Sequence, residues 1–360
     1  MFPPSCFLCA VPKRLYGILT QAFFVNNPNR RHQPFQPSGL ERGSTYGHRQ
    51  FAFGVLRIIA IIRTEAHPET DAVAFIERRK MKIKIIAGTL LARVRAESPI
   101  VHHLTNWVTI YDCASVTKTL GASPVMAHAP EEAAAMAGIA SALVLNIGTL
   151  TVDFVVAMKL AAKSANKKGI PVLLDVCGAG ATRLRDQKSL ELLNEVRIDI
   201  LKGNVSEVAR IAGKAVRTRG VDATCVEGDR VALAVKLARE RKCTVVITGP
   251  EDVVTDGTVT YLIRNGHALM SGVVGTGCMA ASVIGAFAAV EKDLALAAAS
   301  GLACFGIAAE RAAALAQGPA SFKEKLIDNL YRLDPKTAGR FQKVYRASGT
   351  FCQGKRGTDR

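Results

Sequence analysis

The sequence predicts an α/β protein with a mostly parallel central sheet flanked by helices and a C-terminal helical region. From Leu90 onward, stretches with a helical apolar period alternate with short, continuous apolar runs. These runs are rich in Val, Ile and Leu and are apolar on both faces, which is typical of parallel strands covered by helices on each side. Between Gly277 and about Leu333 the chain is alanine-rich and helical in pattern.

Helices and strands alternate in regular order through the centre of the chain. Gly169 and Pro171 mark one junction, as expected where a helix stops before a strand. In order, we expect helix Glu131–Ile139, strand Ala142–Asn146, helix Asp153–Lys168, strand Ile170–Asp175, segment Leu190–Val196, strand Ile198–Lys202, helices Asn204–Ala212 and Val231–Arg241, and strand Cys243–Thr248. This order indicates successive βαβ units in one domain.

The pattern changes after Gly249. Asp256-Gly257 separates the apolar pair Val253-Val254 from the run Thr258–Ile263, and Asp-Gly between two such runs is a strong hairpin signal. We therefore expect a small antiparallel edge on the sheet.

The excess of positive charge is concentrated at the two ends of the chain. Lys and Arg number 47 against 30 Asp and Glu, for a net charge of +17. Eleven basic and five acidic residues precede Met81, and seven basic residues and one acidic residue follow Asp334. The centre is thus only mildly basic and carries no aromatic-and-basic stripe, so we expect anionic small molecules as partners and no nucleic acid.

Composition divides the chain into three regions. Residues 1–80 contain few acidic residues and are expected to form a disordered or targeting extension that folding does not need. Residues 81–335 form the globular domain, for which 49% hydrophobic content supplies a sizeable core. Residues 336–360 are expected to form a basic C-terminal tail.

Cysteine usage and apolar run length bear on the compartment. The nine cysteines are odd in number, and the six between residues 113 and 304 lack paired spacing. This usage favours a reducing, cytoplasmic location, with organellar targeting by the extension as the alternative. No apolar run reaches the length of a membrane span, so no membrane association is expected.

The most informative stretch is Gly275-Thr276-Gly277-Cys278, directly before a long apolar run. Glycines before a helix allow a sharp turn in which unpaired N–H groups converge at the positive end of the helix dipole. Such a point binds an anion and favours the thiolate of Cys278. The alternative is a glycine turn before a buried helix that carries an inert cysteine.

Three predicted strands end in polar residues. Asp175 ends one strand, Lys202 the next, and Thr248 a third. In open parallel sheets the ligand crevice lies beyond the carboxyl ends of the strands, so these residues are candidates for phosphate or metal contacts. Each also has a structural interpretation: Asp175 and Thr248 as turn residues, and the following Asn204 and Glu207 as a helix-capping pair.

The polar and glycine-rich motifs occur in a distinctive order. They are His102-x-Leu104-Thr105-Asn106, Leu120-Gly121-Ala122-Ser123-Pro124-Val125-Met126, Leu145-Asn146-Ile147-Gly148-Thr149-Leu150, Asp175-x-x-Gly178-Ala179-Gly180-Ala181-Thr182, Gly203-Asn204-x-x-Glu207, Ile247-Thr248-Gly249 and Gly275-x-Gly277-Cys278. Together they closely resemble the hydroxyethylthiazole kinase family, which has a ribokinase-like fold and serves thiamine salvage. The resemblance covers about residues 88 to 335, so the globular domain 81–335 is expected to be the kinase domain.

The resemblance implies that ATP phosphorylates the primary hydroxyl of 4-methyl-5-(2-hydroxyethyl)thiazole. Cys278 would accept the proton of that hydroxyl, and Asp175 and Glu207 would organise Mg²⁺ mainly through water. An unperturbed thiol is only a few per cent ionised at pH 7, so we expect a modest contribution from base catalysis. Positioning and electrostatics would carry most of the acceleration.

The resemblance also implies the ligand contacts and the assembly. Lys202, Thr248 and Gly277 would contact the ATP phosphates. Met126 and Gly275 would touch the thiazole, with Asn106 close by. Members of the family are homotrimers with sites at subunit boundaries, so a homotrimer is expected.

The chain departs from the usual family pattern at several positions. Val176-Cys177 stands where Pro-Val is common, and Lys202 where Arg is common. Two other functions therefore stay open, namely a kinase of the same fold for another small alcohol of the pyrimidine or pyridoxal type, and a non-catalytic binder of thiazole or nucleotide. The presence of Asp175, Glu207 and Cys278 together favours catalysis.

Overall fold

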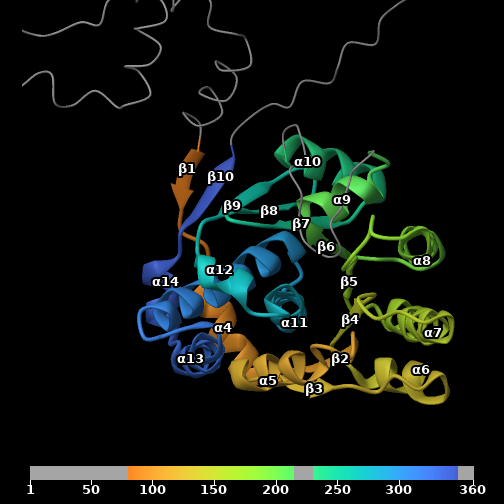
Figure 1. The fold of residues 1–360 in the computed structure, drawn as a ribbon, viewed down its shortest axis with the longest axis horizontal. Coiled ribbons are helices and arrows are strands. Elements are labelled where there is room, and N and C mark those ends of the chain that lie inside the picture. Colours follow the sequence, from red (N-terminus) through yellow and green to blue (C-terminus); the bar gives the residue numbers. More distant parts are fainter. Residues whose placement is uncertain (1–79, 215–229, 348–360) are drawn as a thin grey trace, which may run out of the picture. The chain divides into compact units, whose positions relative to one another are not determined.

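One ten-stranded sheet forms the centre of the described part of the chain. The computed structural model describes residues 80–214 and 230–347. The strands are β1 Lys80–Ile83, β2 Ile100–Leu104, β3 Ser123–Val125, β4 Ala142–Asn146, β5 Val172–Asp175, β6 Ile200–Asn204, β7 Thr244–Thr248, β8 Asp252–Thr255, β9 Thr260–Ile263 and β10 Val344–Ala347. They lie in the order β1-β10-β9-β8-β7-β6-β5-β4-β2-β3 (Figure 1). Strands β2 to β7 pair in parallel, whereas β8, β9, β10 and β1 continue the sheet in antiparallel fashion.

Helices cover both faces of this sheet. They are α4 Ala87–Glu97, α5 Ile110–Leu120, α6 Pro130–Ile139, α7 Val152–Lys168, α8 Arg183–Glu195, α9 Val205–Ile211, α10 Arg230–Arg241, η2 Ala268–Gly272, α11 Thr276–Ala288, α12 Leu294–Ala313, α13 Pro319–Arg332 and α14 Pro335–Phe341. Figure 1 shows α6 to α10 along one side of the sheet, and α4, α5 and α11 to α14 on the other. The predicted α/β class, mostly parallel sheet and C-terminal helical region are confirmed.

Successive side chains of the central strands pack alternately into two hydrophobic cores, one on each face of the sheet. On β4, Val144 packs into the core beneath α11 and α12, whereas Leu143 and Leu145 pack into the core beneath α6 and α7. Successive side chains of a strand point to opposite faces, so a strand buried on both sides has to be apolar at every position. The continuous apolar runs in the sequence are the result.

Most predicted elements lie where the pattern indicates. Strand Ala142–Asn146 agrees at both ends, and the hairpin around Asp256-Gly257 forms, with Gly257 in the left-handed region at φ 90°. Helix α8 starts earlier than the segment expected at 190–196. Thr182 caps the helix by accepting a hydrogen bond from the N–H of Arg185. The first turns of α8 are polar, so the apolar periodicity of the sequence does not show where the helix begins.

Part of the segment expected as a C-terminal tail belongs to the fold. α14 packs on α4 so closely that a Cβ at Gly88 would lie 2.1 Å from the carbonyl oxygen of Pro335. The Gln342 side chain bonds both the N–H and the C=O of Ile85 at 3.0 Å. Residues 336–347 are thus held on the domain, and the predictions for residues 1–79 and 348–360 lie outside the described residues.

Helix α12 is long and apolar enough to cross a membrane by length and composition. However, 78% of its most apolar window is buried, against α4, α11 and α13. This burial is typical of a central core helix.

Candidate active site

Polar side chains of three neighbouring strands meet at the carboxyl edge of the parallel sheet. Asn146 ends β4 opposite Asp175, which ends β5, and Asp175 in turn lies opposite Lys202 on β6. All three side chains are buried. The structure therefore brings Asp175 and Lys202 together, as the strand-end rule predicts, and it adds Asn146 to them.

Helix α11 begins beside these strand ends. Its N-cap, Gly275, has φ 90°, and no side chain caps the first turn. The N–H of Met279 bonds the carbonyl of Gly275 at 2.8 Å. The N–H groups of Thr276, Gly277 and Cys278 precede this first helical bond, so they form the positive end of the helix that the sequence predicts.

The Cys278 sulfur accepts hydrogen bonds from two amides. Asn106 Nδ2 lies 3.2 Å from Sγ, and Asn146 Nδ2 lies 3.3 Å from it. Asn146 Nδ2 also donates to Asp175 Oδ2 at 2.9 Å. Because an amide nitrogen is a donor only, Sγ and Oδ2 both act as acceptors, as a thiolate and a carboxylate do.

The orientation of Asn106 is fixed by Thr109. The backbone N–H and the hydroxyl of Thr109 donate to Asn106 Oδ1 at 3.1 and 3.0 Å. The Asn106 Nδ2 group must therefore face Asn146 and Cys278. This hydrogen bonding selects one of the two amide orientations and directs a donor at the sulfur.

These surroundings lower the pKa of the Cys278 thiol to about 5. The main cause is a hydrogen bond from the Cys177 thiol, which outweighs the opposing effect of burial, and Lys202, Thr109 and Asn106 add to it. The interaction with Cys278, together with burial, raises the pKa of Cys177. The surroundings of Cys278 thus favour its thiolate, whereas the sequence predicts a mostly protonated thiol.

Asp175 and Lys202 form a buried ion pair. Lys202 Nζ lies 3.0 Å from Asp175 Oδ2. Burial raises the pKa of Asp175, and the Lys202 ammonium opposes this rise by favouring the carboxylate. Burial alone would lower the pKa of Lys202, but the neighbouring acidic groups, Asp175 first, reverse the effect and raise it. Asp175 Oδ1 is buried without a hydrogen-bond partner, so the carboxylate has one oxygen left for a further ligand.

Glu207 adopts the capping role considered from the sequence. Its Oε2 accepts from the N–H of Asn204 at 2.7 Å, while Asn204 Oδ1 accepts from the N–H of Glu207, which completes a capping box. Its Oε1 accepts from the N–H of Gly178 at 2.7 Å. Burial raises the pKa of Glu207, against the opposing effect of Lys202. Both carboxylate oxygens are thus engaged with backbone, and Glu207 ties α9 to the loop after Asp175.

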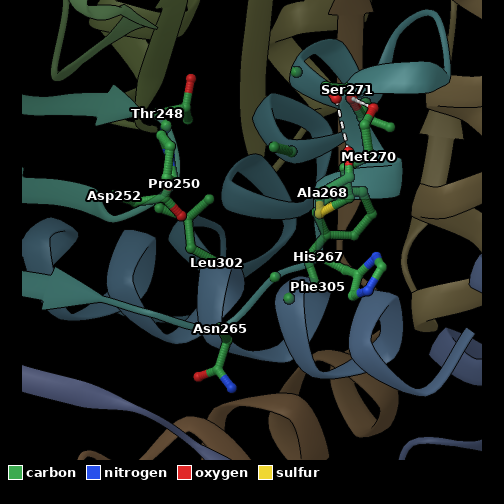
Figure 2. Close-up of a pocket in the computed structure, with 16 residues that line it drawn as sticks. Thr248, Pro250, Asp252, Asn265, His267, Ala268, Met270, Ser271, Leu302 and Phe305 are labelled. Carbon is green, nitrogen blue, oxygen red and sulfur yellow. Dashed lines mark hydrogen bonds between the residues drawn. The ribbon is translucent and has the colours of Figure 1, made fainter. Parts of the chain in front are cut away.

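A cavity of about 510 Å³ opens beside the first turn of α11. Figure 2 shows Thr248 and Asp252 on one side of it and His267 and Met270 on the other. Gly277 also lines it, so the cavity extends to the N–H groups next to Cys278. Burial raises the pKa of Asp252 to about 7, even though the N–H of Gly249 bonds its Oδ1 at 2.9 Å.

Met126 is further from this group of residues. It follows β3, the outermost strand on that side, three strands from β5 in the sheet. Its carbonyl lies 3.1 Å from His128 Nδ1, and the His128 ring packs edge-on against Trp107 with centroids 4.5 Å apart. Met126 is half-buried, and its backbone carbonyl is linked through His128 to Trp107, the residue after Asn106.

The sequence pattern of the hydroxyethylthiazole kinase family matches residues 91–336. The chain belongs to this family. It is 52% identical over 254 residues to hydroxyethylthiazole kinase of Methanosarcina mazei, covering 71% of this chain and 97% of that protein. It is 47% identical over 249 residues to hydroxyethylthiazole kinase of a Roseiflexus species, covering 69% and 92%.

The solved structure of hydroxyethylthiazole kinase protein from Pyrococcus horikoshii has the same fold. It is 41% identical to this chain, with a TM-score of 0.67, and the match covers 73% of this chain and 99% of that one. The ribokinase-like fold expected from the motifs is confirmed.

Two residues of the site in this hydroxyethylthiazole kinase family member are not predicted from the sequence. Asn146 was noted only within a motif, although it closes an apolar strand as Asp175 does. Cys177 was noted only as a departure from the family pattern. No local pattern indicates its effect on the pKa of Cys278, which is 101 positions away in the chain.

The ionisation of Cys278 can be measured directly. The thiolate absorbance near 240 nm, taken as the difference between the unmodified protein and Cys278→Ser, should rise as pH increases through about 5. It should then stay flat between pH 6 and 8, because the lowered pKa leaves the group ionised there. A difference signal that rises only at pH 8 to 9 would show an unperturbed thiol.

Proposed function

We propose that the protein transfers the γ-phosphoryl group of ATP to the hydroxyl of 4-methyl-5-(2-hydroxyethyl)thiazole, as a step of thiamine salvage. Family membership and relatives that carry the name hydroxyethylthiazole kinase support this proposal. The observation that carries it is the open N-terminal turn of α11 next to the Cys278 thiolate, at the end of a cavity of about 510 Å³.

The transferred phosphoryl group would bind at that turn. The N–H groups of Thr276, Gly277 and Cys278 would donate to its oxygens, as at other anion-binding helix N-termini. Phosphoryl transfer requires mainly positioning and electrostatic stabilisation, which fixed backbone donors supply without rearrangement.

Cys278 would accept the proton of the attacking hydroxyl. Its sulfur is held by Asn106 and Asn146, and its pKa of about 5 keeps it ionised at neutral pH. A lowered pKa increases the fraction of Cys278 that is ionised, so its sulfur would contribute more than an unperturbed thiol. The low pKa also makes it a weak base, which fits a transition state in which the proton leaves late.

The site residues fit Mg²⁺ bound mainly through ATP phosphates and water. Among the described residues, no three His, Cys, Asp or Glu side chains converge on one metal position. Asp175 Oδ1 is buried and unpartnered, which suits a cation or its water, whereas both oxygens of Glu207 already bind backbone N–H groups. Asp175 would therefore be the main protein contact of Mg²⁺, with Glu207 holding the loop; Mg²⁺ would neutralise phosphate charge.

The nucleotide would occupy the cavity, with its phosphates directed at α11. Thr248 and Gly277 line it, and Lys202 Nζ lies 3.3 Å from the point where a Cβ of Gly277 would be. The ammonium group and the helix N-terminus thus act on the same position. This arrangement supports the roles of Lys202, Thr248 and Gly277 in phosphate binding.

The thiazole would bind near Asn106, Met126 and Gly275, in a site completed by a neighbouring copy of the chain. We propose a homotrimer, as the family resemblance implies. The surface around Asn106 is apolar and exposed: Trp107 is 50% exposed and Tyr111 79%. An apolar surface of this kind beside a site is suited to burial between subunits.

Turnover with the thiazole alcohol tests the reaction. Purified protein with ATP and Mg²⁺ should form ADP when 4-methyl-5-(2-hydroxyethyl)thiazole is present, in equal amount to the phosphorylated thiazole. The specificity constant should be lower for pyridoxal and for a hydroxymethylpyrimidine. Faster turnover of either would support the other kinase function, and ATP binding without turnover would support a non-catalytic binder.

Substitution of Cys278 tests its role. We expect Cys278→Ala to lower kcat about 100-fold, the range of a lost general base, while KM for ATP changes little. Cys278→Asp keeps an ionised acceptor at the helix N-terminus and should retain activity within about tenfold of the unmodified protein. An alanine variant with full activity would remove Cys278 from the mechanism.

Light scattering tests the trimer. The unmodified protein should have three times the chain mass of 38.4 kDa. Tyr111→Glu introduces a charge into the proposed interface and should lower this mass. The matched control is Tyr331→Glu on α13, because Tyr331 is exposed to a similar degree, 71%. A trimer that survives Tyr111→Glu would exclude this surface as the interface.

A further inference from the structure

Arg185, near the start of α8, bonds both loops that follow strands β4 and β5 at the site. Its Nη2 donates to the carbonyl of Gly148 at 2.7 Å. Its Nη1 donates at 3.0 Å to two carbonyls, those of Ile147 and Cys177. One guanidinium group therefore joins the loop after β4 to the loop after β5, although Arg185 is not among the site residues predicted from the sequence.

The Gly148 backbone contacts both amides that bond the Cys278 sulfur. Its N–H donates to Asn146 Oδ1 at 2.8 Å. A Cβ at Gly148 would lie 3.0 Å from Asn146 Oδ1 and 3.0 Å from Asn106 Nδ2. The glycine is thus packed directly on the two asparagine side chains, so a shift of its backbone would move them.

The bond from Gly148 also selects the orientation of Asn146. Because a backbone N–H can only donate, the atom that it meets has to be the oxygen of the amide. The nitrogen of Asn146 is then directed at Cys278 Sγ, 3.3 Å away. Thr109 fixes Asn106 in the same way. The two amides beside the sulfur are therefore held from both ends, by Thr109 and by the Gly148 backbone.

The guanidinium group is suited to holding this backbone. It stays charged at every pH at which the protein is folded, and it presents its N–H donors in a rigid, planar arrangement. Hydrogen bonds from a charged donor are roughly twice as strong as neutral ones. The backbone of Arg185 is itself fixed in α8, since its carbonyl accepts from Ser189 Oγ at 2.7 Å.

We propose that Arg185 is a positioning residue for phosphoryl transfer, which holds the backbone of Ile147 and Gly148 and so directs the Asn146 amide at the Cys278 sulfur. Its effect on rate rests on the proposed function, because only turnover shows the consequence of a misplaced sulfur. Its hold on the loop is a property of the folded chain and can be measured without turnover.

Kinetics of Arg185→Ala test the effect on rate. We expect kcat with the thiazole alcohol to fall about tenfold, because small misplacements of reacting groups have effects of at least this order. KM for ATP should change by less than about twofold, because other segments line the cavity proposed for the nucleotide.

The double variant with Asn146→Ala separates positioning from a merely structural role. In Asn146→Ala the amide that Arg185 directs is gone, so the addition of Arg185→Ala should lower kcat by less than about a further twofold. A structural role would lower kcat by the same factor whether or not the amide is present.

Two further variants provide the controls. Arg183→Ala removes an exposed arginine from the first turn of the same helix and should behave like the unmodified protein. Arg185→Lys keeps the positive charge but loses the planar arrangement of donors. It should therefore fold normally and still show the lowered kcat, which keeps the test valid if Arg185→Ala does not fold.

Amide hydrogen exchange tests the hold on the loop. In Arg185→Ala and Arg185→Lys, a peptide that covers residues 147–150 should exchange faster, while peptides of α12 should exchange as in the unmodified protein. The proposal is wrong if exchange at 147–150 or kcat is unchanged, or if kcat falls equally with and without the Asn146 amide. An unmodified protein that forms no ADP would contradict the proposed function instead, and the exchange result would still show whether Arg185 holds the loop.

Discussion

The buried ion pair between Lys202 and Asp175 is the interaction on which the candidate site depends. The two residues are register partners on adjacent parallel strands, and their charged atoms lie 3.0 Å apart with almost no exposure. Burying two ions costs several kcal/mol each and is repaid only when their other polar atoms find partners. Asn146 supplies such a partner to Asp175 Oδ2, while Oδ1 has none. The pair therefore stabilises a local charge arrangement that a bound cation would complete.

Hydrogen-bonded amide side chains connect the ion pair to the Cys278 sulfur. Thr109 fixes Asn106, Asn106 donates to Asn146 at 3.0 Å, and Asn146 donates to both Asp175 and Cys278. Each member has one orientation that satisfies all its partners, and such networks specify a single geometry when every member is bonded. Asp175 and Cys278 thus share the Asn146 amide as a hydrogen-bond donor, although one lies on strand β5 and the other on helix α11.

The sequence predicts much of this arrangement, because parallel strand ends share one edge of a sheet. That rule finds Asp175, Lys202 and Thr248, and the glycine turn finds Cys278. It does not find β10, a strand of four residues between β1 and β9, in which Val344 is the only fully buried residue. Nor does it find the hydrogen bonds from Asn106 and Asn146 to Cys278, which depend on how α11 lies against the strand ends. The residue pattern of a segment predicts whether that segment is a helix or a strand. Contacts between distant segments depend on how those segments pack, which no pattern within one segment shows.

The two glycines of the turn before α11 serve different physical needs. Gly275 has φ 90°, and a Cβ there would lie 2.4 Å from Thr109 Cγ2, so its absence lets the turn pack on the residue that orients Asn106. A Cβ at Gly277 would meet only the end of Lys202, at 3.3 Å. Its absence therefore leaves the space between the ammonium group and the helix N–H groups open. The Lys202 ammonium and the N-terminus of α11 both create a positive potential at this point, and an anion bound there would lie directly beside the Cys278 sulfur.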